Sequence, residues 1–250
     1  MDPDMLRATV LAAPDALILA VASLGFASIY AGYAVGAGAL ASWMEARGIG
    51  TTVDTRALAP GQVRAEILAS ARSILIFGGF GLLNVVLERA GLVRIDWRLD
   101  PVKLPLDLVV ITLWNEVHFY ASHRLLHHPW LYRHVHLEHH RSIRSTAWAT
   151  YRFHWVEAVL LGSVMVTCLA WYPLGIGAIV LFPGVSLAMN ALGHWNHEAV
   201  APGHRWSWFW GATRRHADHH QRVRGNFGFL FPHLDRWLGT RLPPVPTRAP

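Results

Sequence analysis

The chain has 250 residues, of which 53% are hydrophobic and only 15% are charged. Soluble domains carry about 25% charged residues, so a single soluble domain of this length would lack polar surface. The high hydrophobic content also excludes a disordered chain. One cysteine, Cys168, excludes a disulfide framework, a thiolate zinc finger and a Cys-ligated iron–sulfur cluster.

Histidine is the second unusual feature of the composition. The chain has 16 histidines, as many as all its acidic residues together. The first is His118 and the last is His233, so this polar chemistry is confined to the second half of the chain.

Three apolar stretches in the first half are long enough to cross a bilayer or nearly so, which takes about 20 residues. They cover residues 16–44, 67–87 and 104–121, and the first has no charged residue. The acidic start at Asp2 and Asp4 and the length of the first stretch favour a retained transmembrane helix over a cleaved signal peptide.

The longest uncharged run covers residues 158–193 and is broken by Pro173, Gly175 and Gly177. These residues are typical of a turn, so the run predicts a tight hairpin of two helices that enters the membrane and returns. All histidines then lie on one side of the membrane. The arginines among them make that side cytoplasmic by the positive-inside rule, although the basic loop 88–103 argues for the reverse.

The sequence therefore predicts an all-α protein, an integral membrane helical bundle with four to five transmembrane helices and a cytoplasmic, histidine-rich helical cap. We expect an N-terminal membrane region with two transmembrane helices over residues 1–103 and a histidine-bearing domain over 104–240. Residues 241–250, which include four prolines, predict a disordered tail.

The histidines form motifs with metal-ligand spacing. Residues three and four apart lie on one face of a helix, so each motif directs two or three imidazoles to one place. Neutral imidazole binds Fe, Zn, Cu and Ni, and eight such residues exceed what one ion takes, which implies two metals. The motifs are His123 with His127, His136 with His139 and His140, and His216 with His219 and His220.

Two further histidines stand where the hairpin returns to the cytoplasmic surface. His194 is a candidate ninth ligand and His197 a candidate tenth. His118 and His128 lie off the faces of their neighbouring motifs at about 100° per residue, so we do not expect them to share those metals. His154 and Glu157 are three residues apart and could form a carboxylate–histidine pair.

Other chemistry is not indicated. The sequence lacks the zinc-protease motif HExxH, the carboxylate di-iron motif ExxH and the serine-hydrolase motif GxSxG. It also lacks the P-loop and dinucleotide-binding motifs. The sequence pI of about 10.1 is high, but the arginines lie among the histidine motifs and beside apolar segments. We therefore expect anionic lipid or an acidic protein as partner, and no nucleic acid.

Several segments together resemble the fatty acid hydroxylase/sterol desaturase superfamily, a group of membrane di-iron oxygenases with histidine boxes. The resemblance covers residues 104–240, where we expect a fatty acid hydroxylase-like catalytic domain. The segments are residues 114–127 (WNEVHFYASHRLLH), 129–136 (PWLYRHVH), the His139–His140 pair, 153–157 (FHWVE), 219–228 (HHQRVRGNFG) and 235–240 (DRWLGT).

The resemblance implies a di-iron centre that uses O2 to hydroxylate or desaturate an unactivated C–H bond of a membrane lipid, such as a sterol or fatty acyl chain. It implies nine ligands, namely His123, His127, His136, His139, His140, His194, His216, His219 and His220, with His197 near a variable tenth position. Glu116 and Glu157 are the candidates for orienting these ligands, and Tyr120, Trp148 and Trp195 for walls of the substrate site. Because the chain holds no cytochrome b5 domain, electrons would come from a separate acidic ferredoxin or cytochrome b5.

Two alternatives stay open at this point. One is a carotenoid hydroxylase or ketolase, because those enzymes also use histidine boxes. The other belongs to a different class, a membrane metal transporter, although a transporter should place its ligands near the bilayer midplane.

Overall fold

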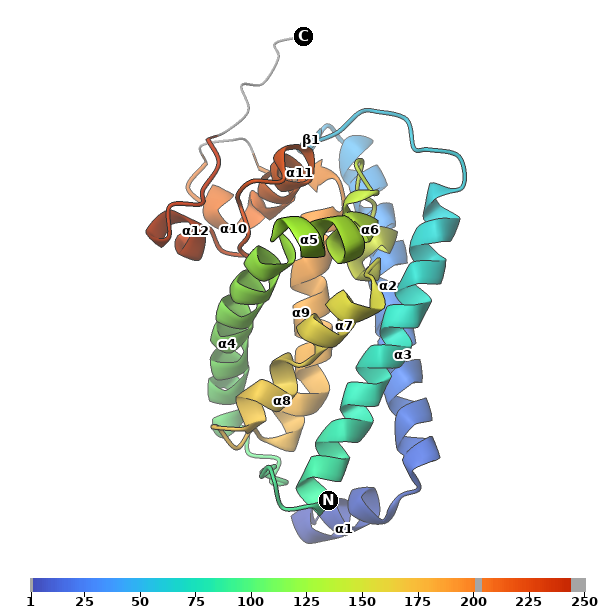
Figure 1. Ribbon diagram of the computed structural model, residues 1–250, viewed down its shortest axis with the longest axis vertical. Helices are drawn as coiled ribbons and strands as arrows, with labels where there is room; N and C mark the ends of the chain where they lie inside the picture. The colour runs from blue at the N-terminus through green and yellow to red at the C-terminus, as the bar shows by residue number, and fades with distance from the viewer. Residues whose placement is uncertain (1, 201–203, 244–250) are drawn as a thin grey trace.

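The computed structural model describes residues 2–200 and 204–243, and these fold mainly into helices. Four long helices run along the longest axis of the molecule (Figure 1). They are α2 (Asp15–Glu45), α3 (Gln62–Arg89), α4 (Lys103–Leu126) and α9 (Ile176–His194). Beside them, α7 (Trp155–Gly162) and α8 (Val164–Leu169) form a shorter helical arm that is interrupted at Ser163.

Short elements gather at one end of the long helices, opposite α1 (Pro3–Ala12) (Figure 1). This end holds α5 (Pro129–Leu131), the π-helix Tyr132–His136, α6 (Leu137–His140), α10 (Ser207–Trp210), α11 (Ala212–Arg222) and α12 (His233–Trp237). A 3₁₀ helix, Ala147–Tyr151, joins α6 to α7. The strand β1 (Thr51–Thr52) pairs antiparallel with β2 (His197–Glu198), which ties the segment after α2 to the segment after α9.

Three of the described helices, α2, α3 and α9, are long and apolar enough to cross a membrane. They coincide with the predicted stretches 16–44 and 67–87 and with the second arm of the predicted hairpin. The two other predicted spans, residues 104–121 and the first arm of the hairpin, do not form helices that are both long and apolar enough. The helix α4 has sufficient length, but buried polar residues such as Asp107, Asn115 and Glu116 lower its hydropathy. The first hairpin arm, α7 with α8, is a shorter apolar helix.

The hairpin turn lies between α8 and α9, as the sequence predicts. Pro173 and Gly175 are in the connection, whereas Gly177 belongs to the first turn of α9. The predicted tail lies largely outside the described residues, which end at residue 243. The start of α4 at Lys103 coincides with the predicted domain boundary, and the division into two domains stays a prediction.

Small residues and apolar packing hold the bundle together. A Cβ atom added at Gly81 of α3 would lie 2.8 Å from Cβ of Ala22 in α2, so glycine permits the close approach of these helices. Two clusters of buried residues form the interior. One includes Ile111, Leu174 and Phe182, and the other, nearer the histidines, includes Tyr30, Phe77, Tyr151, Phe153 and Leu187.

At the end of the bundle far from the histidines, Asp107 joins α4 to the hairpin turn. Its buried carboxylate accepts hydrogen bonds from Lys103 Nζ at 2.6 Å, Tyr172 Oη at 2.8 Å and the backbone N–H of Gly175 at 2.7 Å. Removing the carboxylate leaves these donors without their acceptor in a part of the molecule with little access to water.

We predict that Asp107→Ala lowers the free energy of unfolding by about 2–3 kcal/mol, because several partly buried donors lose their acceptor. Thermal unfolding of the detergent-purified protein measures this as a lower Tm. Asp4→Ala is the control, since Asp4 is exposed and its side chain forms no hydrogen bond or ion pair with a described residue. Equal Tm values for the two variants would contradict the role given to Asp107.

Candidate metal centre

Nine of the ten histidines that the sequence suggests as ligands come together in the structure. They form two groups, and within each group the candidate ligand atoms all lie within 4.8 Å of one another. We call these groups site A and site B. Site A contains His123, His127, His136, His140 and His219, and site B contains His139, His194, His216 and His220.

Four segments supply these side chains. The last turn of α4 and its C-cap carry His123 and His127, and the end of α9 carries His194. Pro129 begins α5, and the π-helix and α6 that follow carry the second motif. A π-helical turn shifts the phase of the side chains relative to an α-helix and is frequent at functional sites. The third motif lies on α11.

The two HxxHH motifs are divided between the sites in a reciprocal way. His136 and His140, four residues apart, point to site A while His139 points to site B. On α11 the pair His216 and His220 points to site B while the remaining histidine of that motif points to site A. Each of these motifs thus directs two imidazoles to one site, as the spacing predicts, and its remaining imidazole to the other site. The sites are adjacent, with the rings of His140 and His220 4.5 Å apart between centroids.

One nitrogen of several rings is fixed by a hydrogen bond away from the site. Nδ1 of His123 is 2.9 Å from the carbonyl oxygen of Phe227, and Nδ1 of His219 is 2.7 Å from that of Gly225. Nδ1 of His194 is 2.9 Å from the carbonyl oxygen of Asn190. A carbonyl oxygen only accepts, so Nδ1 carries the proton in each ring and Nε2 presents a lone pair.

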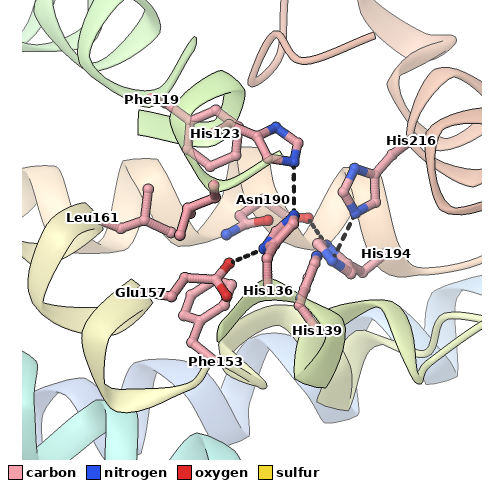
Figure 2. Close-up of a pocket in the computed structure, with 11 residues that line it drawn as sticks. Phe119, His123, His136, His139, Phe153, Glu157, Leu161, Asn190, His194 and His216 are labelled. Carbon is pink, nitrogen blue, oxygen red and sulfur yellow. Dashed lines mark hydrogen bonds and ion pairs between the residues drawn. The ribbon is translucent and has the colours of Figure 1, made fainter. Parts of the chain in front are cut away.

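These lone pairs face one another. The Nε2 atoms of His127 and His219 are 3.1 Å apart in site A, and those of His194 and His216 are 2.9 Å apart in site B. Figure 2 shows Nε2 of His123 directed at His136, with 3.1 Å between their Nε2 atoms. His136 is fixed in turn, because its Nδ1 lies 2.8 Å from Glu157 Oε1.

Two neutral imidazoles that both present lone pairs cannot hydrogen-bond to each other, whereas a cation between them satisfies both. Ligand nitrogens about 2.1 Å from one ion, at right angles to each other, would lie about 3 Å apart. The observed Nε2 separations of 2.9–3.2 Å match this spacing. The residues present therefore fit two metal ions, one in each site.

Burial keeps these imidazoles in the neutral form that metals require. It lowers the pKa of His219 to about 4 and, together with the neighbouring His219, lowers the pKa of His127 to about 3. Burial, reinforced by the other histidines, also holds the pKa of His216 and His220 well below the usual value. At neutral pH the rings of both sites are ready to bind a metal without first losing a proton.

His197 is the one suggested ligand that the structure does not bring into either site. It lies on β2, where its Nε2 is 2.9 Å from the carbonyl oxygen of Ile49 and its Nδ1 is 3.8 Å from Glu45 Oε1. Strand pairing with β1 holds the residue there. His118 also stands apart, with its Nε2 3.1 Å from Ser163 Oγ, and His128 is exposed.

Glu157 and Glu116 support the sites in different ways. Glu157 is buried and contacts His136 directly, rather than forming the pair with His154 that the spacing suggests. His154 caps α7 instead, where its Nδ1 accepts from the N–H of Val156. Glu116 touches no histidine of either site, and its carboxylate accepts from the backbone N–H of Leu230 at 3.1 Å.

The loop after α11 is the part of the site that the sequence motifs do not reveal. Its carbonyl groups at Gly225 and Phe227 anchor two ligands, and Asp235 holds the loop by accepting from the N–H of Phe227 and of Gly228, both at 2.8 Å. Val223 and Asn226 have φ of 52° and 55°, a strained conformation that is frequent at functional sites. The NFG segment and Asp235 lie in the two C-terminal segments that resemble the fatty acid hydroxylase/sterol desaturase superfamily. That resemblance is the one sequence feature that points to this loop.

An apolar cavity of about 420 Å³ approaches the histidines from within the bundle. Phe119, Phe153, Leu161 and Asn190 line both this cavity and a smaller hollow beside His123, His136 and His194 (Figure 2). The expected wall residues Tyr120, Trp148 and Trp195 do not line the cavity. Their polar atoms bond elsewhere, as in the hydrogen bond from Trp195 Nε1 to Thr213 Oγ1 at 2.7 Å.

We predict that the metal-free protein loses stability as the pH falls below about 6.5. In the unfolded state the histidines take up protons near that pH, while the buried ring of His219 resists protonation until about pH 4. The unfolded state therefore binds more protons, which lowers the free energy of unfolding as the pH falls. Tm values of chelator-treated protein at pH 8 and pH 5.5 measure the effect.

The control uses one buried and one exposed histidine. His219→Gln should flatten the dependence of Tm on pH, and His128→Gln should leave it unchanged because that residue is exposed. A Tm that is independent of pH in the unsubstituted protein would overturn the explanation.

The chain is similar to several curated proteins. The chain is 26% identical over 223 residues to a Delta(7)-sterol 5(6)-desaturase of Aspergillus fumigatus, which covers 76% of this chain and 66% of that protein. It is 28% identical over 134 residues to a putative methylsterol monooxygenase of Dictyostelium discoideum, covering 51% of this chain and 47% of the relative. A cholesterol 25-hydroxylase-like protein of Danio rerio is 29% identical over 166 residues, with 63% and 61% covered.

These matches span about half to two thirds of the length of the curated relatives. No solved structure matches the chain. The family model described as fatty acid hydroxylase matches residues 108–240, which include all nine histidines of the two sites. The chain belongs to the fatty acid hydroxylase family.

Proposed function

We propose that this protein is a membrane-bound di-iron oxygenase that hydroxylates or desaturates an unactivated C–H bond of a lipid. The observation that carries the proposal is the juxtaposition of the two histidine sites with an apolar cavity. The small hollow that shares Phe119, Phe153, Leu161 and Asn190 with the cavity is also lined by histidines of both sites.

In this proposal the five histidines of site A hold one iron and the four of site B hold the other. Bound iron would supply the redox chemistry by which O2 and two electrons oxidise a C–H bond. Hydroxylation places one oxygen atom in the lipid and releases the other as water, with two protons consumed. Desaturation removes two hydrogen atoms and reduces both oxygen atoms to water.

The chain's own residues hold the ligands in place. Glu157 keeps Nε2 of His136 available by binding its Nδ1, and the carbonyl groups of the loop 225–227 do the same for His123 and His219. Glu116 supports this loop indirectly, because its carboxylate accepts a hydrogen bond from the backbone N–H of Leu230. Outer hydrogen bonds of this kind typically change metal affinity or activity by about 10–100-fold.

The cavity selects the substrate class. Its lining is mainly apolar and comes from α2, α3, α4, α7, α8 and α9, so it accepts a sterol ring system or an acyl chain and excludes water. A lipid would enter from the bilayer between these helices. The named relatives act, by their descriptions, on sterols, which makes a sterol the first substrate to test.

We further propose that α4 and the α7–α8 arm lie in the membrane beside α2, α3 and α9, which gives four to five membrane helices. The histidine cap would then lie on the cytoplasmic side. A separate acidic carrier, a ferredoxin or a cytochrome b5, would deliver electrons to the basic cap. The position of both sites at one end of the long helices disfavours a transporter, whose ligands would lie near the midplane (Figure 1).

We predict that purified protein binds two irons and that each site can be emptied separately. His219→Ala removes a ligand of site A and His139→Ala one of site B, so each should lose roughly half of the iron and lower turnover by more than about 100-fold. Iron analysis and lipid mass spectrometry measure both quantities. His128→Ala is the control, and full turnover by His139→Ala would sink the two-iron assignment.

We also predict that a larger side chain where the apolar cavity meets the histidine hollow blocks substrate access without removing metal. Leu161→Trp narrows the passage shared by the cavity and the histidine hollow, and should lower turnover by about 10-fold or more at unchanged iron content. Val159→Trp is matched, because it adds the same side chain to the exposed face of the same helix. The assay follows a lipid that gains one oxygen atom or loses two hydrogen atoms. Equal turnover by both variants would refute this substrate route.

A further inference from the structure

A second cavity, of about 540 Å³, lies in the cap and takes no part in the metal sites. Its lining is cationic, with residues contributed by the segments of α10, α11 and α12. The lining includes Arg205, Trp208, Arg215, His233, Arg236 and Arg241. We call this the arginine pocket.

The positive charge of the arginine pocket is largely uncompensated. Arg205, Arg236 and Arg241 are exposed, and none forms an ion pair with an acidic residue of the described chain. The nearby carboxylate of Asp235 is buried and is occupied by the backbone N–H groups of Phe227 and Gly228. Among the described residues, these three guanidinium groups therefore have no carboxylate partner, although that of Arg205 lies over the Trp206 ring, 5.6 Å from its centroid.

Arg215 forms the floor of the pocket instead of contributing a free charge. Its guanidinium donates to the carbonyl oxygens of Ser207 at 3.0 Å, Trp208 at 2.9 Å and Leu230 at 2.6 Å. Burial, reinforced by the charge of Arg241, lowers its pKa to about 10. The lining residues place these cationic groups around one hollow. An anion placed there would interact with all of them.

Trp208 lines the pocket, and three more exposed tryptophans lie on the segments that contribute to it. Trp206, Trp208, Trp210 and Trp237 have exposed fractions of 46%, 39%, 37% and 76%. Large amphipathic rings are costly to leave in water, and they concentrate where a protein meets the headgroup region of a membrane. Arginine beside tryptophan at this level is typical of a surface that contacts anionic lipid.

The neighbouring face of α4 shows where the chains of such a lipid would lie. Leu106, Val109, Leu113 and Val117 form an exposed apolar stripe along this helix. Tyr120 continues the stripe within about 60° at 100° per residue, but it is buried, and its Oη lies 2.9 Å from Thr240 Oγ1. The segment that carries Arg241 thus contacts α4 through Thr240, one turn beyond the end of the stripe.

We infer that the arginine pocket binds the phosphate headgroup of an anionic phospholipid, whose acyl chains lie along the apolar stripe of α4. The inference rests on the proposed membrane placement of α4 and is independent of the metal chemistry. It also agrees with the proposed orientation, since anionic lipids are concentrated in the cytoplasmic leaflet. An acidic electron carrier would account for the arginines but for neither the tryptophans nor the stripe.

The test uses full-length, iron-loaded protein in detergent, titrated with dioctanoyl phosphatidylglycerol and, separately, with dioctanoyl phosphatidylcholine. Native mass spectrometry counts the lipid that stays bound. We expect phosphatidylglycerol to bind at least roughly 10-fold more tightly than phosphatidylcholine. The Arg236→Gln/Arg241→Gln protein should lose roughly 30-fold in affinity for phosphatidylglycerol, from two lost headgroup contacts.

The control variant is Arg64→Gln/Arg133→Gln, which removes two exposed arginines that lie outside the pocket and form no ion pair with a described residue. It matches the change in net charge and should bind phosphatidylglycerol as the unsubstituted protein does. Arg236→Lys/Arg241→Lys keeps the charge and should retain most of the binding. Unchanged iron content and Tm show that each variant is folded, and these readouts separate a failure here from a failure of the proposed oxygenase.

Four outcomes would overturn the inference. One is equal affinity for the two lipids, and another is equal loss of binding in the pocket and control variants. The third is that the Arg236→Gln/Arg241→Gln protein still binds phosphatidylglycerol but no longer binds an acidic ferredoxin or cytochrome b5. That result would make the pocket a docking site for the electron carrier. Displacement of phosphatidylglycerol by inorganic phosphate at comparable concentration would likewise show that the pocket binds free phosphate and not a lipid.

Discussion

The arrangement of the cap depends on one electrostatic problem, the meeting of unprotonated imidazole nitrogens. Nine histidine rings point their Nε2 atoms into two adjacent sites, and hydrogen bonds on the opposite side of several rings prevent them from turning. Burial keeps these rings neutral, so protonation cannot relieve the repulsion between their lone pairs. The protein therefore carries two clusters of electron pairs that only cations can satisfy. The structure around them serves to hold these rings in place.

The support for these rings comes from backbone as much as from side chains. The loop between α11 and α12 offers its carbonyl groups to His123 and His219, and Asp235 and Glu116 hold the loop from two directions. The floor of the arginine pocket uses the same loop, because Arg215 binds the carbonyl oxygen of Leu230. A lipid or protein that contacts the cap from this side would thus touch a segment that also positions metal ligands.

Much of the fold follows from periodicity and length alone. The apolar runs identify α2, α3 and α9, and Pro173 and Gly175 mark the turn between the hairpin arms. Spacing also identifies the nine histidines that the structure gathers into the two sites. It does not predict how each HxxHH motif is divided between the sites, or that His197 lies on β2. These depend on a π-helical turn and on a strand pair with residues 51–52, neither of which has a local sequence signal. The partner of Glu157 is 21 residues away and is likewise set by tertiary packing.

The division of the HxxHH motifs has a consequence for how such a centre can change. Because α6 and α11 each contribute to both sites, a shift or rotation of either helix displaces ligands of both ions together. The sites are mechanically coupled and cannot be remodelled one at a time by moving these helices. Variation that leaves the centre intact must therefore fall on the elements that line the cavity and carry no ligand of either site, namely α2, α3, α7 and α8. A new substrate can be accommodated there while the ligand framework stays fixed.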